Sequence, residues 1–364
     1  MDRHDIPEEI TAEHVAQMHQ EDLKVEHLYG CKGLTYWCDV DRKTAFCLIQ
    51  APDPGAINAM HQHAHGAVPH KIIEVDPRVV ESFLGRIEDP EKAGEHELNI
   101  IDDPAFRVIM CIETSNYLHR LEALQYSIFT QKFHHSVTNS LEQFEGSIVR
   151  QDNHSYLVSF RSVTNAVLCA LKIRSNFKYI TPKFDPAIRQ LHIGISAGAP
   201  VEDEEAVFGT VITTARNMCE YMEAPLVVSS EIKTLYENEN RNARIDRKVI
   251  RVLGPGDEQF LNHLVTFCEK RFGDDEISVP DFSSELGHSK SKLYRRLKKL
   301  SGKSPNRFLR EFRLRKALQL LHRNYGSISE IAYETGFNNP AYFTKCFSDT
   351  FGILPSKYLQ QHVA

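Results

Sequence analysis

The sequence lacks the features of a secreted, membrane-spanning or disulfide-stabilised protein. Its 364 residues include eight cysteines, none spaced as Cys-x-x-Cys, so we expect free thiols in a reducing cytoplasm. No apolar run is long enough to span a bilayer, and the first residues show no basic segment followed by an apolar one. These absences predict a cytoplasmic protein without a membrane span or signal peptide, and the length allows two or three domains.

Positive and negative charges are unevenly divided along the chain, although the net charge is only −6. From Ile277 onward there are 15 Lys and Arg residues against 6 Asp and Glu. The preceding 276 residues hold 28 basic and 43 acidic side chains. A basic module at the end of an acidic chain is typical of phosphate binding confined to that end. We therefore do not expect the acidic part to contact DNA.

The run from Ser289 to Leu300 has the pattern of a basic amphipathic helix. Its first residue can cap the helix, and Leu293 and Leu297 recur at helical spacing on one face. A short amphipathic segment before it ends at Gly287, where a sharp turn can form. A short helix, a glycine turn and a basic helix are the pattern of a helix-turn-helix, whose second helix enters the DNA major groove.

The same pattern occurs again fifty residues later. Leu293 and Leu297 correspond to Phe343 and Phe347, and the second turn falls at Gly336. The run NRFLREFRLRKALQLL between the copies predicts one long helix. This arrangement resembles the AraC/XylS-type DNA-binding domain, in which a linker helix holds two helix-turn-helix units. The resemblance covers about Gln259 to Gln360 and implies an all-α domain that binds double-stranded DNA; the alternative is a helical bundle with an incidental basic face.

The resemblance also places particular side chains toward DNA. Arg295 is the best single candidate, because a guanidinium can bind guanine O6 and N7 together. Asn339 can reach an adenine or only cap its helix, and Ala341 can contact a thymine methyl. The candidates for base contacts are Ser291, Tyr294, Arg295, Asn339, Ala341, Thr344 and Lys345. The candidates for phosphate contacts are Lys290, Lys292, Lys298, Lys299 and Arg307.

Residues 1–80 predict a small domain with the order β-α-β-β-α-β, which is ferredoxin-like. His61 and His65 are four residues apart in the second helix, so one helical face presents both imidazoles, a spacing that suits zinc or nickel. The segments RHDIPE, MHQEDL, TYWCD, AFCLIQAP and AHGAVPHKIIEV resemble a small ferredoxin-like family described as nickel-binding. The resemblance implies a metal site with the candidate ligands His4, His19, His61 and His65. The alternative is that these histidines lie on the surface or form hydrogen bonds in the core.

Residues 100–254 predict a βαββαβ core with additional helices and strands. The run HIGISAGAPV, followed by FGTVITTARNMCEYMEAPLVVSSEIKTLY, resembles the class III adenylate/guanylate cyclase domain, an α/β sandwich that pairs head to tail around a shared cleft. The resemblance implies a homodimer through this domain. Cyclases need metal-binding aspartates, but those places hold Ile112 or Glu113 in the first strand and Asn153-His154-Ser155 in the hairpin. We therefore expect no catalytic residues and no enzyme activity.

One cyclase-type side chain is retained, because Arg216 stands where the family has an arginine, although Ile212 replaces the asparagine. Two interpretations of Arg216 remain open. It can hold a nucleotide in the remaining cleft, or it can make a structural ion pair, which we favour.

The whole sequence predicts an α+β multidomain protein with domains at 1–80, 100–254 and 257–364. The predicted function is sequence-specific transcription regulation, with the first two domains sensing a small-molecule or metal effector or forming a dimer. Two alternatives remain: a class III nucleotide cyclase fused to a DNA-binding domain, and a metal-responsive regulator that binds nickel or zinc.

Overall fold

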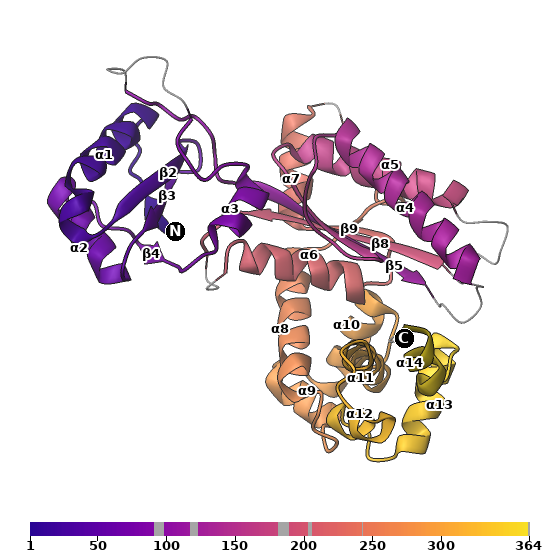
Figure 1. Ribbon diagram of the computed structural model, residues 1–364. Helices are drawn as coiled ribbons and strands as arrows, with labels where there is room; N and C mark the ends of the chain where they lie inside the picture. Colours follow the sequence, from indigo (N-terminus) through magenta and orange to yellow (C-terminus); the bar gives the residue numbers. More distant parts are fainter. Residues whose placement is uncertain (91–97, 117–122, 181–188, 203–205, 242, 363–364) are drawn as a thin grey trace.

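The computed structural model describes residues 1–90, 98–116, 123–180, 189–202, 206–241 and 243–362. The chain forms three groups of elements that follow one another in sequence, as Figure 1 shows. In the described residues no helix is both long and apolar enough to cross a membrane. All eight cysteines are free and buried, as predicted.

The first group is a four-stranded antiparallel sheet with two helices. Its strands, in the order β2-β3-β1-β4, are β1 (Asp2–Asp5), β2 (Lys32–Asp39), β3 (Thr44–Gln50) and β4 (Lys71–Ile72). The helices are α1 (Ala12–Val25), followed by the 3-10 turn η1 (Glu26–Tyr29), and α2 (Pro54–Ala64). Thr11 and Asp53 cap α1 and α2 by accepting backbone N–H groups, as short polar side chains do.

The last strand of this group is shorter than the sequence pattern predicted. Strand β4 ends at Ile72, because Asp76 accepts the backbone N–H of Arg78 and starts α3 (Pro77–Leu84). This helix runs across the boundary expected at residue 80. Its side chains Val80 and Phe83 pack in one apolar cluster with residues of both sheets. The first two groups therefore share a core.

The second group is a six-stranded sheet with helices on both faces. Its order is β10-β9-β8-β5-β7-β6, with strands β5 (Arg107–Asn116), β6 (Ser147–Gln151), β7 (Ser155–Phe160), β8 (Arg189–Gly198), β9 (Leu226–Val228) and β10 (Arg251–Val252). One face carries α4 (Ala123–Gln143), α5 (Val163–Ile180) and α7 (Ser230–Glu239), and the other carries α6 (Gly209–Tyr221), as Figure 1 shows. Along β5, Met110 and Ile112 belong to the core under α4 and α5, whereas Ile109 and Cys111 belong to the core under α6. This alternation is the period of two that a strand buried on both faces requires.

The third group consists of helices only. They are α8 (Pro255–Arg271), α9 (Val279–Glu285), α10 (Lys290–Ser301), α11 (Pro305–His322), α12 (Ile328–Glu334), α13 (Pro340–Phe351) and α14 (Pro355–His362). The two predicted turns are present at Gly287 and Gly336, whose φ angles are 61° and 75°. Such left-handed values favour glycine. The pattern of two helix-turn-helix units joined by one long helix is confirmed, with α9 and α10 as the first unit and α12 and α13 as the second.

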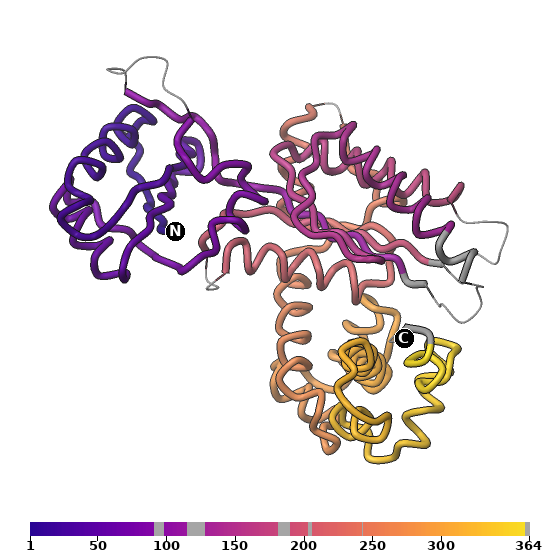
Figure 2. Tube along the Cα trace, viewed as in Figure 1, coloured from indigo at the N-terminus to yellow at the C-terminus, as the bar shows by residue number. Residues whose placement is uncertain are grey.

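The two helix-turn-helix units have different cores. The first unit shares its core with the second group of elements, since Met218 and Tyr221 of α6 pack with Phe308 and Phe312 of α11 and with the leucines of α10. The core of the second unit is a separate cluster that contains Phe343 and other residues of α11 to α14. Figure 2 shows the same relation in the trace, where α8 leads directly from beneath α6 into the helical group. The first unit is therefore built onto the body of the protein, by which we mean residues 1–254.

The position of α6 depends on close contact with β8. A Cβ atom added at Gly194 of β8 would lie 2.0 Å from the carbonyl oxygen of Ala215 and 2.8 Å from the backbone nitrogen of Cys219. Helix α6 can therefore approach the sheet this closely only because residue 194 has no side chain.

Replacing Gly194 with alanine is expected to destabilise the protein by about 3 kcal/mol or more, because the added methyl meets backbone atoms that cannot rotate away. Urea unfolding of the full chain measures this. Gly256→Ala in α8 is the matched control, since its new Cβ would have ordinary contacts only, and we expect no loss of stability. Equal stability of the two variants would contradict this account of α6.

Candidate functional site

Helix α10 presents basic and polar side chains on one face and buries the other. Ser289 caps it by accepting the N–H of Lys292 at 3.3 Å, and Leu293 and Leu297 are fully buried. The exposed face carries Lys290, Ser291, Lys292, Tyr294, Arg295, Lys298 and Lys299. The structure thus places these predicted contact residues together on one accessible helix surface. Arg307 lies apart from them in α11, where its Nε donates to Glu311 at 2.7 Å.

Helix α13 has the same arrangement with fewer charges. Phe343 and Phe347 are buried, Asn339, Ala341 and Lys345 are exposed, and Thr344 is half-buried. The side-chain oxygen of Asn339 accepts the N–H groups of Ala341 and Tyr342 at 2.9 and 3.0 Å, which is the capping role that the sequence allowed. Tyr342, exposed beside these residues, was not predicted, although it corresponds to Lys292 in the repeat.

Arg296 holds α10 against α8, where Lys299 also lies 3.5 Å from Asp257 Oδ2. Its Nε donates to Asp257 Oδ1 at 2.9 Å, another nitrogen donates to the Gly256 carbonyl, and its guanidinium lies 4.3 Å from the ring centroid of Phe260. A signal for this role was present in the sequence. Arg296 follows Leu293 by three residues, which places it at the edge of the buried stripe.

The C-terminal end of α10 is bound by the body. Arg251 of β10 donates to the carbonyl oxygens of Leu300 and Lys299 at 3.2 and 2.6 Å, and the backbone N–H of Glu223 also donates to Leu300 at 3.2 Å. The last carbonyls of a helix have no partners within it, so these contacts satisfy them. The position of the exposed face of α10 is thereby tied to the sheet of the body.

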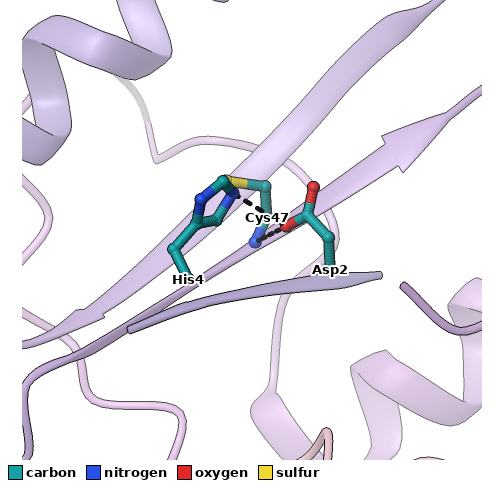
Figure 3. Close-up of side chains that lie close together, drawn as sticks. All are labelled: Asp2, His4 and Cys47. Atoms are coloured by element: carbon teal, nitrogen blue, oxygen red, sulfur yellow. Dashed lines mark hydrogen bonds and ion pairs between the residues drawn. The ribbon is translucent and has the colours of Figure 1, made fainter. Parts of the chain in front are cut away.

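Two groups of metal-ligating side chains lie in the first sheet and its helices. In the first, the carboxylate of Asp2 accepts the backbone N–H of Cys47 at 2.9 Å, and His4 Nε2 lies 3.6 Å from the same oxygen. Figure 3 shows the three side chains converging from the neighbouring strands β1 and β3, where Asp2 and Cys47 are paired in register. His4 Nε2 is buried and makes no hydrogen bond.

The second group consists of Asp22 from α1 with His61 and His65 from α2. Asp22 Oδ1 lies 3.0 Å from His61 Nδ1 and 3.2 Å from His65 Nε2. The other ring nitrogen of His61 lies 3.0 Å from Asp2 Oδ2, so His61 joins the two groups. Burial alone would lower its pKa, but the hydrogen bonds to Asp2 and Asp22 raise the pKa of His61 to about 9. Without a metal, His61 is an imidazolium between two carboxylates.

The predicted histidines are only partly brought together. His4, His61 and His65 lie in these two groups, whereas His19 lies outside both, with Nε2 3.1 Å from Asp89 Oδ2. Sequence reasoning missed three further donors, which are Asp2, Asp22 and Cys47. A signal existed for Asp22, because it follows His19 by three residues on the buried face of α1, where an unpaired acid would be costly.

A cleft of about 710 Å³ lies between the body and α11, and Arg216 lines it. Glu113 and the hairpin residues Asn153, His154 and Ser155, which occupy the places of the missing cyclase aspartates, line it as well. Among the described residues, the only groups able to hold a metal ion are the two in the first sheet and its helices. Arg216 acts electrostatically on Glu220 of the same helix but forms no close ion pair among the described residues, so both interpretations of Arg216 remain predictions.

Comparison with known families identifies both ends of the chain. Residues 282–361 match a family described as helix-turn-helix domain, and residues 1–75 match one described as nickel responsive protein SCO4226-like. The C-terminal segment thus matches a helix-turn-helix domain, as its repeat predicted.

Two curated relatives match parts of the chain. The HTH-type transcriptional activator RhaS of Escherichia coli is 34% identical over 95 residues, which are 26% of this chain and 34% of that protein. Histidine kinase P4 of Formosa agariphila is 34% identical over 152 residues, which are 39% of this chain and 11% of that protein. The chain therefore spans about a third or less of the length of these relatives.

A solved structure is similar to the helical group. The transcriptional regulator from Chromobacterium violaceum, described as AraC-type DNA-binding domain-containing, is 29% identical; the match covers 29% of this chain and 95% of that one, with a TM-score of 0.28. This similarity covers less than a third of the chain.

Replacing His61 with alanine is expected to lower the free energy of unfolding by about 3–5 kcal/mol, because Asp2 and Asp22 would remain buried without their cation. His63→Ala is the matched control, since His63 is two residues from His61, lies on the exposed side of α2 and is hydrogen-bonded to the Tyr29 hydroxyl. We expect a change within about 0.5 kcal/mol for the control in chemical denaturation of the metal-free protein. Similar values for the two variants would contradict the buried charge pairing.

Proposed function

We propose that the protein is a sequence-specific DNA-binding transcription regulator whose body senses an effector or forms a dimer. The observation that carries this proposal is the exposed basic face of α10, repeated in a second helix-turn-helix unit on the same linker helix. The matching family of helix-turn-helix domains supports it. A cyclase fused to a DNA-binding domain is not favoured, since the aspartate positions in the cleft hold other residues.

Different side chains would supply the affinity and the sequence specificity of DNA binding. Lys290, Lys292, Lys298 and Lys299 supply positive charge for phosphates, and this binding weakens as salt rises. Arg295 is the candidate for a guanine contact, and Ser291 and Tyr294 flank it on the same exposed face. In the second unit, Ala341, Thr344 and Lys345 are the candidates, and Asn339 retains its amide nitrogen for a base because only its oxygen serves the cap.

The domain organisation is part of the proposal, with units at 1–80, 100–254 and 257–364. Support for a ferredoxin-like first domain comes from its element order and from the strand order β2-β3-β1-β4. We also propose a cytoplasmic location, where a DNA-binding domain has its target. A homodimer through residues 100–254 remains part of the proposal. Because α11 lines the cleft within the same chain, head-to-tail pairing around that cleft would require α11 to move.

The test is selection of the full-length protein on a randomised DNA duplex pool at fixed salt. We expect one motif to be enriched, and Arg295→Ala to lose about 1–3 kcal/mol of discrimination at one base position. Lys298→Ala is the matched control on the same face, and should weaken binding to all sequences and reduce the salt dependence. If no motif is enriched by the wild-type protein, the proposed function is wrong.

A second function, response to a divalent metal, is favoured by the two groups around His61. Imidazole, carboxylate and thiol donors fit nickel or zinc, and the buried His4 Nε2 without a hydrogen bond is suited to a ligand. The candidate ligands are His4, Asp2 and Cys47 in one group and Asp22, His61 and His65 in the other; His19 would serve only if Asp89 released it. The carboxylates that stabilise a charged His61 would equally stabilise a metal cation, whose role would be structural or regulatory.

Calorimetric titration of the metal-free protein with Ni²⁺ and with Zn²⁺ tests this function. We expect near-stoichiometric binding, and a loss of affinity of about tenfold or more in Cys47→Ser or His65→Ala, each of which removes one donor. His63→Ala should bind as the wild type does. No binding of either metal, or unchanged affinity in both donor variants, would exclude metal sensing at this position.

We further propose that Arg216 offers an anion site in the cleft, where a nucleotide phosphate would bind. Arg216 is half-buried, forms no ion pair among the described residues, and lines the cleft together with polar side chains of the β6–β7 hairpin. An arginine in such a place suits phosphate, because its planar donors bind two oxygens at once.

A further inference from the structure

Helix α11 forms one wall of the cleft that Arg216 lines. Its residues Arg315, Gln319 and His322 are spaced by four and three, so they lie on one face of the helix. Gln319 and His322 line the cleft directly, together with Glu113, Arg216 and Glu220 of the body. The cleft therefore has one wall from the body and one from the DNA-binding end of the chain.

The two halves of α11 contact the body in different ways. In the first half, Phe308 and Phe312 pack on Tyr221 of α6, with ring centroids 5.4 and 5.7 Å apart, within a shared apolar core. In the second half, Arg315 lies 3.6 Å from Glu113 and 4.0 Å from Glu220. These ion pairs are about one-third exposed, and such pairs contribute little stability. The second half of α11 therefore contacts the body through partly exposed polar groups, whereas the first half is held by a buried apolar core.

The second half of α11 leads into the second helix-turn-helix unit. His322, the last residue of α11, lines the cleft and is hydrogen-bonded to the hydroxyl of Tyr358 in α14. Tyr358 is buried and packs against Phe347 of α13 in the core of the second unit. A molecule that contacts His322 thus lies one hydrogen bond away from this core.

Three arginines and three carboxylates lie at the cleft, and two of the arginines form close ion pairs. Arg315 is shared by Glu113 and Glu220, and Arg150 is 3.6 Å from Asp152. Arg216 has no such partner among the described side chains. The cleft therefore suits a small molecule with one anionic group for Arg216 and polar atoms for the amide and imidazole of the opposite wall.

We propose that this cleft is an effector site whose occupant, a small molecule with a phosphate-type anionic group bound to Arg216, also contacts Gln319 and His322 and so holds the second half of α11 against the body. The inference rests on the proposed anion site and on the proposed DNA binding. A ligand that binds both walls favours the docked arrangement of α11, and through it one relative placement of the two helix-turn-helix units. By linkage, DNA bound in that arrangement must change ligand affinity by the same factor.

The experiment uses the full-length protein with ATP and with tripolyphosphate as probes, each titrated with and without the selected DNA duplex. We expect Arg216→Gln to weaken both probes about tenfold or more, because the charge that binds phosphate is lost. Gln319→Ala is expected to weaken ATP about threefold or more and to abolish the effect of ATP on DNA affinity. Arg323→Gln is the matched control, an exposed charge one residue after His322, and should match the wild type.

The outcomes separate the proposals from one another. If ATP binding depends on Arg216 but not on Gln319, the anion site is supported and the role of α11 is wrong. The role of α11 is equally wrong if ATP does not change the affinity for DNA. If neither probe binds, the anion site and the role of α11 are both wrong, while binding of the duplex by the wild-type protein still decides the DNA-binding function. Tripolyphosphate binding as tightly as ATP would identify the phosphate chain as the recognised group and support a phosphate effector.

Discussion

The arrangement of the protein depends on the packing of α6. On one side this helix lies against β8, at the distance that Gly194 permits. On the other side it packs on α8 and α11, where Tyr221 contacts the rings of Phe308 and Phe312, and Asn217 donates to Asn262 of α8 at 2.8 Å. A single helix therefore belongs to the core of the sheet and to the core of the first helix-turn-helix unit. A rotation or shift of α6 would change both cores, since packed interiors do not deform continuously.

The first sheet is connected to this helix by polar contacts. Arg3, which lies between Asp2 and His4 on β1, donates to the Val201 carbonyl at 3.2 Å, and Lys71 of β4 donates to the Glu202 carbonyl. Residues 201 and 202 precede α6 in the chain. The candidate metal groups, the cleft and the DNA-binding helices are therefore linked by contiguous contacts through one element. Contiguity is a necessary condition for coupling between such sites, and measured coupling energies are what establish it.

Much of the fold could be predicted from the sequence, because local signals determine it. Apolar side chains at helical spacing, with Gly287 and Gly336 at the turns, located both helix-turn-helix units, and alternating apolar runs located the strands of both sheets. The contacts between distant segments could not be predicted. Arg296, for example, holds α10 against α8 through Asp257 and Phe260, which are far from it in sequence. Likewise, Asp2 and Cys47 form a group with His4 only because β1 pairs with β3, and pattern analysis gives no register for such pairing.

The capping of α10 by Arg251 has a consequence for the modularity of the chain. A DNA-binding domain at one end of a chain is often treated as a module that can be separated and fused to another protein. Here residue 251 precedes the helical group, so a fragment that begins at α8 would carry α10 without the cation that binds its terminal carbonyls. The same cut would expose the faces of Phe308 and Phe312 that Tyr221 covers. In a chimaera, the replacement for residues 1–254 would have to supply both an equivalent cation and an equivalent aromatic surface. The body and the helical group of this chain therefore form a shared structure at their boundary and are not joined by an independent linker.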